Sequence, residues 1–173
     1  MVSLLQTLWR KAVGSSPKLA CNTRVWNRGV DELRRRAGGH CESGAFLLGT
    51  IEGGMRRIHK FLYYDDIDAN CFSNGIVEFD GSKFGIVWQI CRDSDLTVVA
   101  DVHVHPGGYG QSSTDRHNPI IPEAGHLALI LPDFASRART PGAMGIYEYL
   151  GSRQWRNHSP QGARIFRVGR WQK

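Results

Sequence analysis

The feature of this sequence that most constrains its fold is a short apolar run followed by a tight turn. Residues 45–51 read Ala-Phe-Leu-Leu-Gly-Thr-Ile, which has the length and composition of a buried strand. Gly53 and Gly54 follow, and adjacent glycines favour a hairpin turn because they adopt positive φ at no steric cost. Residues 55–64 are the expected partner strand. The sequence therefore predicts an antiparallel hairpin within a sheet.

Apolar residues recur at helical spacing before and after this hairpin, which indicates two amphipathic helices. The stripe before it comprises Trp26, Val30, Leu33 and Ala37. The stripe after it comprises Phe84, Val87, Trp88 and Cys91. Asn22 or Thr23 is the expected cap of the first helix, and the glycine pair that begins at Gly38 marks its end. Asp80 or Ser82 is the expected cap of the second helix.

Five more segments are rich in β-forming residues and read as strands. They cover residues 76–79, 96–105, 125–131, 144–150 and 163–168. Helices and strands are mixed without a regular strand–helix–strand alternation. This arrangement favours an α+β fold with a mixed or mostly antiparallel sheet.

The composition bounds the class of protein. The 173 residues suit one domain with a substantial core, since domains average about 150 residues. A hydrophobic fraction of 41% and five Trp exclude a disordered chain, and no apolar run approaches the roughly 18 residues of a membrane span. Apolar residues within 4–12 lie on one helix face and do not form a signal peptide. We therefore expect a helical extension over residues 1–20 and a single domain over residues 21–173.

Cysteine usage and charge give weaker indications. No Cys-x-x-Cys pair is present, so we expect free thiols and a cytoplasmic location. The formal net charge of +6 combines +7 over residues 1–63, −8 over residues 64–136 and +7 over residues 137–173. Basic ends would bind nucleic acid only if they met on one face, whereas an acidic middle suits a basic protein segment.

The sequence Asp-Val-His-Val-His-Pro contains the most informative residues, His103 and His105. On a strand they project to the same side about 6.5–7 Å apart along the chain, as a pair of zinc ligands would. Asp115, which follows a glycine-rich loop in the sequence, offers a third, anionic ligand. Ser112 and Asp115 also have the spacing of a helix capping box, which would fix the direction of the carboxylate. A His, His, Asp set leaves the fourth tetrahedral position for water, as in catalytic zinc sites.

Water at such a site needs a general base, and Glu42 is the candidate. This carboxylate lies immediately before the apolar run 45–51, where it is poorly explained as surface decoration. The alternative interpretation of Glu42 is a charged residue that caps the strand.

Together these residues resemble the JAMM (JAB/MPN-plus) family of zinc metalloproteases. The family's pattern is a strand Glu, then His-x-His-Pro, then Ser-x-x-Asp, and its parts appear here at Glu42, at His103 to Pro106 and at Ser112 to Asp115. The similarity extends from about residue 24 to 150. It implies a cytidine-deaminase-like (JAB/MPN) α/β/α sandwich with a mixed, mostly antiparallel sheet, in place of the α+β fold that the pattern favours.

The resemblance also implies the role of each residue. The zinc (Zn2+) ligands would be His103, His105 and Asp115. Glu42 would act as general base and proton shuttle, and Ser112 would donate a hydrogen bond to the oxyanion.

The loop before Ser112 departs from the family's pattern. Six residues separate His105 from Ser112, where the family usually has seven. Ser113 would restore the spacing, but it would place Arg116, which cannot bind zinc, at the ligand position. We therefore keep the register that uses Asp115 and expect the loop glycines to absorb the missing residue.

Family members cleave peptide or isopeptide bonds after the C-terminal glycine of ubiquitin or ubiquitin-like proteins. The small size resembles stand-alone bacterial members that accompany ubiquitin-like conjugation enzymes in antiphage defence operons. We therefore expect a ubiquitin-like protein or its conjugates as substrate and conjugation enzymes of the same operon as partners, and neither nucleic acid nor membrane. The alternatives are a noncatalytic MPN-type scaffold and a RadC-like nucleic-acid-associated protein, to which the Arg- and Trp-rich segment 153–173 points.

Overall fold

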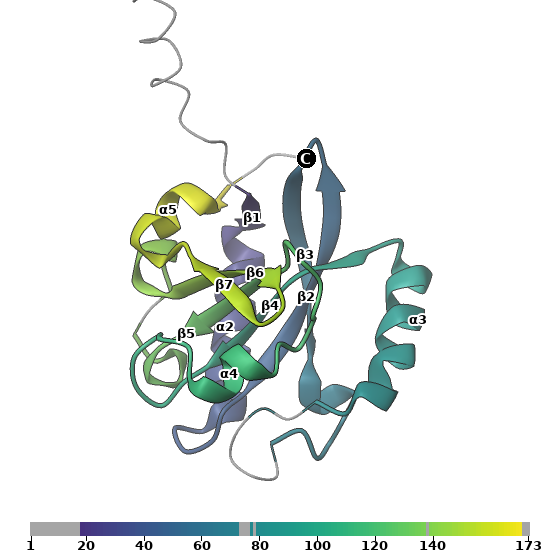
Figure 1. Cartoon of the computed structure of the whole chain (residues 1–173), viewed down its shortest axis with the longest axis horizontal. Helices are drawn as coiled ribbons and strands as arrows, with labels where there is room; N and C mark the ends of the chain where they lie inside the picture. Colours follow the sequence, from purple (N-terminus) through teal and green to yellow (C-terminus); the bar gives the residue numbers. More distant parts are fainter. Residues whose placement is uncertain (1–17, 73–76, 78, 138, 171–173) are drawn as a thin grey trace, which may run out of the picture.

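The protein is described by a computed structural model that covers residues 18–72, 77, 79–137 and 139–170. Within these residues, eight strands form one mixed sheet in the order β7-β6-β5-β4-β2-β3-β1-β8 (Figure 1). The strands are β1 (Leu19–Asn22), β2 (Gly44–Glu52), β3 (Met55–Tyr63), β4 (Thr97–Val104), β5 (Leu127–Leu131), β6 (Gly145–Gly151), β7 (Gln154–Asn157) and β8 (Phe166–Gly169). Four of the seven neighbouring pairs are antiparallel, so the prediction of a mixed sheet is confirmed.

Helices lie on both faces of this sheet. The helices are α2 (Thr23–Ala37), α3 (Phe84–Ser94), α4 (Ser113–His117) and α5 (Gly162–Ile165). Short 3-10 turns cover Tyr64–Asp66, Gly81–Lys83, Asp133–Ala135, Pro141–Ala143 and Ser159–Gln161. Along β2, Ala45 and Leu47 belong to the core cluster that includes α2, whereas Phe46 and Leu48 belong to the cluster that includes α3. Because strand residues alternate between faces, α2 and α3 cover opposite faces of the sheet.

The predicted first helix is confirmed as α2. Trp26, Val30 and Leu33 are fully buried, as the helical stripe requires. The Asn22 side chain accepts a hydrogen bond from the backbone N–H of the second helical residue, and Gly38 ends the helix with φ of 57°. Both helix ends are therefore fixed by residues that the sequence identifies. The second predicted helix is confirmed as α3, and Asp80 caps the 3-10 turn that leads into it.

The predicted hairpin is confirmed as β2 and β3, joined at Gly53 and Gly54 with φ of 56° and 80°. A bulge interrupts this hairpin, because Leu48 pairs with Lys60 while the next residue, Gly49, pairs with Ile58. A Cβ at Gly49 would overlap the opposing backbone carbonyl, so the bulge requires glycine there.

Other predicted elements differ from the structure. The strand expected over 163–168 begins only at Phe166, because Gly162 packs against the backbone of Pro141 and starts a helical turn, α5. Val77 and Phe79 lie in no strand, and the other two residues of the strand expected over 76–79 lie outside the described residues. The expected N-terminal helix also lies outside them, whereas residues 19 and 20, which we assigned to that extension, belong to β1.

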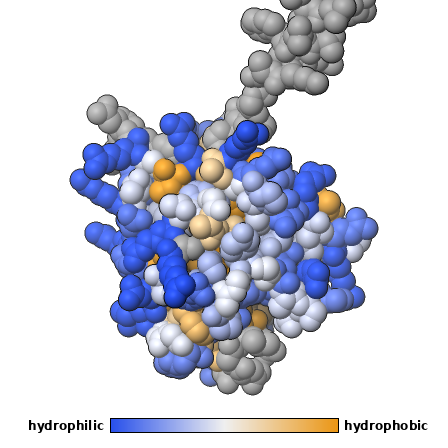
Figure 2. Space-filling view, turned by 90° about the vertical axis from the view of Figure 1, so that its left-hand side faces the viewer, coloured by the Kyte–Doolittle hydropathy of each residue, from blue (hydrophilic) through white to orange (hydrophobic). Residues whose placement is uncertain are grey.

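Polar contacts tie the two ends of the described chain to the sheet. We define the Glu148 cluster as Glu148 with Lys18 and His158, whose side-chain nitrogens lie 2.9 Å and 2.7 Å from its carboxylate. Figure 2 shows that hydrophilic residues dominate one side of the molecule, with hydrophobic residues exposed only in small areas. In the part of the chain that the structure describes, no helix has the length and hydrophobicity needed to cross a bilayer.

Candidate metal centre

The candidate site begins at the C-terminal end of β4. His103 and His105 are separated by one residue, so they project to the same face, and both are buried. The backbone on each side is held by ladder bonds, since His103 pairs with Gly44 of β2 and with Ile130 of β5. The Nε2 atoms of the two histidines lie 3.0 Å apart. The strand thus presents two imidazole nitrogens toward a single point.

Asp115 of α4 supplies the third group. Its Oδ1 lies 3.5 Å from His103 Nε2, and its Oδ2 lies 3.3 Å from His105 Nε2. One ligand atom from each of the three residues lies within 4.8 Å of the others. The structure therefore brings together the three residues that the sequence predicts as ligands.

The capping box at the start of α4 determines where Asp115 points. The backbone N–H of Asp115 donates to Ser112 Oγ at 3.1 Å, and the backbone N–H of Ser112 donates to Asp115 Oδ2 at 2.6 Å. The box that we predicted from the Ser-x-x-Asp spacing is confirmed. The second bond holds the carboxylate oxygen that also faces His105, so Ser112 supports the candidate ligand directly.

Glu42 lies beside the three groups without joining them. Its Oε1 is 3.9 Å from His105 Nε2, and its Oε2 accepts a hydrogen bond of 3.1 Å from the backbone N–H of Val77. The side chain is only 13% exposed. A buried carboxylate at this distance is close enough to exchange a proton with a molecule held by the histidines, yet it is turned toward Val77 by a bond of its own.

The distances approach those around a tetrahedral zinc ion. Zinc–nitrogen bonds of about 2.0–2.1 Å place neighbouring tetrahedral ligands about 3.3–3.4 Å apart. Here the two imidazole nitrogens lie 3.0 Å apart, His103 lies 3.5 Å from Oδ1 of Asp115 and His105 lies 3.3 Å from Oδ2, so each histidine faces a different carboxylate oxygen. Two neutral imidazoles and one carboxylate are also the donor types that zinc accepts in catalytic sites. The residues present therefore suit the metal that the sequence predicts.

Electrostatics at the site favour a cation. Burial opposes the ionised carboxylate of Asp115, but hydrogen bonds from His103 and His105 hold the pKa of Asp115 well below its usual range. Burial likewise opposes a charge on His103, yet the Asp115 carboxylate raises the pKa of His103. The carboxylate thus stays anionic and attracts positive charge, which a proton or a metal ion can supply.

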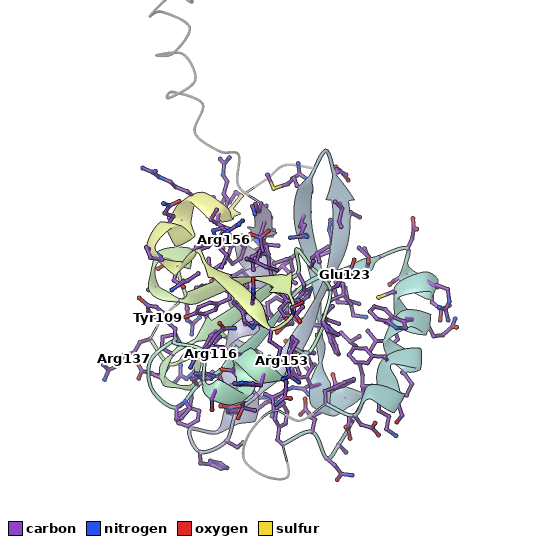
Figure 3. All side chains as sticks on the ribbon, viewed as in Figure 1. Tyr109, Arg116, Glu123, Arg137, Arg153 and Arg156 are labelled. Atoms are coloured by element: carbon purple, nitrogen blue, oxygen red, sulfur yellow. The ribbon has the colours of Figure 1, made fainter. Side chains whose placement is uncertain are left out.

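A small cavity of about 30 Å³ adjoins the candidate metal ligands. Its lining includes His103, Asp115 and Trp155, and the indole of Trp155 donates to the backbone carbonyl of Arg116 at 3.1 Å. The β6–β7 hairpin is therefore anchored to α4. Figure 3 shows Arg116 on α4 and Arg153 on this hairpin.

A buried network that the sequence did not predict lies next to the ligands on β4. Asp101 projects to the same face as His103, and its two carboxylate oxygens lie 2.6 Å from His126 Nε2 and 3.3 Å from the Tyr64 hydroxyl. His126 is thus buried and held by the Asp101 carboxylate. The Asp101–His126 pair spans β4 and β5, so it braces the strand that carries the histidines.

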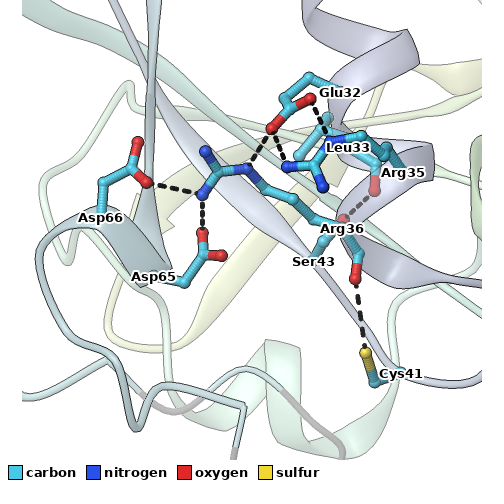
Figure 4. Close-up of polar contacts among 8 residues, drawn as sticks. All are labelled: Glu32, Leu33, Arg35, Arg36, Cys41, Ser43, Asp65 and Asp66. Carbon is cyan, nitrogen blue, oxygen red and sulfur yellow. Dashed lines mark hydrogen bonds and ion pairs between the residues drawn. The ribbon is translucent and has the colours of Figure 1, made fainter.

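The acidic middle of the sequence does not form one acidic surface. Arg36 of α2 lies 2.5 Å from Asp65 and 2.7 Å from Asp66, and it also contacts Glu32 (Figure 4). Asp101 is buried against His126, and the acid at position 115 belongs to the candidate metal centre. Four of the eleven acids in this block are therefore placed against basic or imidazole groups of the chain itself, and the attraction of a basic segment to the block stays a prediction.

Comparisons with known proteins inform the fold. No protein-family model matches the chain. A protein from Desulfitobacterium hafniense, known from a solution structure, has a similar fold, with a TM-score of 0.64 and 13% sequence identity over 89% of this chain and 95% of that one. A solution structure from Salinibacter ruber matches with a TM-score of 0.49 and 19% identity over 78% of this chain and 82% of that one. The first likeness shows a shared fold.

Proposed function

We propose that this chain is a zinc-dependent peptidase of the JAMM (JAB/MPN-plus) type. The observation that carries the proposal is the meeting of four side chains from three separate segments. Glu42 precedes β2, His103 lies near the end of β4 with His105 just beyond it, and Asp115 lies on α4. Their ligand and base atoms lie within 3.9 Å of the nearest neighbour in the group. A sheet with helices on both faces is also what the expected cytidine-deaminase-like sandwich requires.

The first step of the proposed reaction concerns water. A bound zinc ion acts as a Lewis acid, which polarises a carbonyl and makes water more acidic. Glu42 accepts the proton of the attacking water, since its Oε1 faces His105 across 3.9 Å. The bond from Val77 holds the other oxygen of Glu42, so the free oxygen is aimed at the reaction centre. Glu42 then delivers this proton to the departing amine.

Ser112 acts on the carbonyl of the bond to be cleaved. Its Oγ accepts a hydrogen bond from the Asp115 backbone, which leaves the hydroxyl hydrogen available to an external oxygen. A donor at the position where negative charge develops lowers the barrier most when it is already oriented. The capping box supplies this orientation.

The substrate follows from the family type. We propose that the enzyme cleaves after the C-terminal glycine of a ubiquitin-like protein, as a free precursor or as a conjugate, in a bacterial ubiquitin-like conjugation pathway of antiphage defence. Its partners are the conjugation enzymes of that pathway. We propose a cytoplasmic location, in keeping with four cysteines that are all free. A glycine terminus suits a water-sized cavity beside the ligands, because it needs no side-chain pocket.

The test combines cleavage with metal analysis. Zinc-loaded protein is incubated with ubiquitin-like proteins that carry a C-terminal extension, and cleavage is followed by intact mass. We expect Glu42→Gln to lower the rate by about 10²–10⁴-fold while one zinc per chain is retained. His103→Ala should lose the zinc as well as the activity, and Glu123→Gln is the matched control for an exposed carboxylate. Cleavage that persists in Glu42→Gln and in the presence of chelator would contradict the proposal.

A further inference from the structure

We infer that the groove between α2 and β3 binds the phosphate groups of a nucleotide, either free or as part of a single strand. The inference does not depend on the proposed peptidase activity, since the groove contains none of the residues assigned to it. The groove is lined by Arg24, Val25, Arg28, Gly29, His59, Lys60, Phe61 and Tyr63 and has a volume of about 430 Å³. This volume lies within the range of small-molecule sites, roughly 300–1,000 Å³.

Three cations line the groove without an acid among them. Arg24 and Arg28 are exposed on α2, and Lys60 is exposed on β3. Among the described residues, none of these three side chains forms an ion pair. Unpaired cations that share one hollow repel each other, so an anion that enters the hollow is attracted by all three.

The acids nearest to Arg28 along α2 are engaged elsewhere. Glu32 lies one helical turn beyond Arg28, but its oxygens accept hydrogen bonds from Arg35 and Arg36 (Figure 4). These bonds lower the pKa of Glu32 to about 2. Asp31 is bonded to Arg139 at 2.6 Å. The helix therefore carries acids, yet they do not neutralise the groove.

The backbone is shaped to make the hollow. Gly29 faces the ring of Phe61, and a Cβ at Gly29 would overlap that ring. A glycine within a helix costs about 1 kcal/mol relative to alanine, and here it lets Phe61 lie beneath the helix as the floor of the groove. On the opposite wall, the bulge opposite Gly49 leaves His59 out of the pairing with β2, and His59 and Lys60 are both exposed, although they are adjacent in the strand.

The side chains suit phosphate in particular. Arg24 and Arg28 are four residues apart, so their guanidinium groups are neighbours on the helix surface. A guanidinium presents paired N–H donors that match two phosphate oxygens, and an ammonium such as that of Lys60 adds a point charge. The edge of the buried Phe61 and the half-buried Tyr63, whose ring carries Arg36 on one face, give the groove an apolar side for a base. A nucleotide offers both the phosphates and the flat base.

The sequence alone did not predict this site. All three cations belong to the basic block over residues 1–63, where Arg24 and Lys60 are 36 positions apart and give no local motif. Parallel pairing of β1 with β3 places the start of α2 beside residue 58, and this brings the two segments together.

The experiment measures binding of ATP by calorimetry and of a fluorescently labelled ten-residue deoxythymidine oligonucleotide by anisotropy. The variants are Arg28→Glu and Lys60→Glu, and Arg164→Glu is the matched control, because Arg164 is an exposed cation on α5 that does not line the groove. We expect each groove variant to weaken binding by about tenfold or more, as loss of a charge-assisted hydrogen bond does, while the control changes it little. Because the three side chains are exposed, circular dichroism should show unchanged folding.

The two probes distinguish the source of the phosphate. Tighter binding of ATP identifies a free nucleotide, and tighter binding of the oligonucleotide identifies a strand. For the oligonucleotide, neutralisation of three phosphates by the three cations predicts that log affinity falls with log salt concentration with a slope of about −2. Three results would overturn the inference. The first is no binding of either probe at about 1 mM, roughly the weakest useful affinity. The second is an equal loss of binding in Arg164→Glu, and the third is equal binding of a hexaglutamate peptide.

Discussion

The capping box at Ser112 leads to a quantitative prediction about metal affinity. In Ser112→Ala the Asp115 backbone loses its bond to Oγ, and removal of such a cap costs about 0.5–2 kcal/mol. Helix α4 has only five residues and buries none of them, so the cap and the bond from the Trp155 indole to the Arg116 carbonyl are its main anchors. Part of this loss falls on the orientation of the Asp115 carboxylate. Since 1.4 kcal/mol corresponds to a tenfold change, we expect zinc affinity to fall by about 2- to 30-fold.

The assay is a competition for Zn2+ against a chromophoric chelator at fixed pH. Ser113→Ala is the matched control, because this neighbouring serine does not cap α4, and Ser112→Thr should keep most of the affinity. The unfolding free energy of the metal-free protein should fall by no more than the roughly 0.5–2 kcal/mol that the cap contributes. Unchanged affinity in Ser112→Ala would refute the reasoning. A loss beyond about 1,000-fold would also refute it, because it would make the Ser112 side chain itself a ligand.

Three further predictions concern stability, pH and thiol chemistry. Gly49→Ala should lower the unfolding free energy by about 2–4 kcal/mol in denaturant titrations, because the added Cβ would overlap a backbone carbonyl. Gly81→Ala is the control, since a Cβ there meets no neighbouring atom, and its unfolding free energy should be within about 0.5 kcal/mol of wild type. Although burial opposes ionisation of Glu148, its bonds in the Glu148 cluster lower the pKa of Glu148 below that of an unfolded glutamate. Stability from this carboxylate is then present above pH 4.5 and lost as the pH falls below it, so Glu148→Gln should cost about 1–2 kcal/mol at pH 7 and little at pH 3. Cys21 is buried, and burial raises its pKa to about 12, so iodoacetamide should modify the half-buried Cys41 before Cys21. Peptide mass mapping over time measures the two rates, and equal rates would contradict the burial of Cys21.

Elements with a complete local signal were predictable from the sequence. Helix α2 has an apolar stripe, an N-cap and a terminal glycine, and the hairpin has an apolar run and two turn glycines. In each case all the local signals predict the same element. Strand β1 was missed because four residues are too few to show a period. It exists because Leu19 and Cys21 are buried between β3 and β8, which is a tertiary effect.

The candidate site likewise has parts that the local sequence predicts and parts that depend on the tertiary structure. The histidine pair and the capping box are local patterns, and both have the predicted geometry. The bond from Val77 to Glu42 joins residues 35 positions apart, and the Asp101–His126 pair joins residues 25 positions apart. No local rule predicts such bonds, because they depend on how loops and strands are placed by the whole sheet.

The position of Glu42 itself is set by the end of α2. Gly38 ends that helix, and the chain then turns back along it, where the Cys41 thiol contacts the carbonyl of Ala37 at 3.3 Å. The Ser43 hydroxyl donates to the carbonyl of Leu33 at 2.7 Å (Figure 4), so both neighbours of Glu42 are bonded to the last turns of the helix. A carboxylate between two such anchors has little freedom, and β2 begins immediately after it, paired with the strand of the histidines. The geometry of the candidate base therefore follows from the same helix end that the sequence identifies, and a substitution at Gly38 that lengthens α2 should misplace Glu42 without touching any metal ligand.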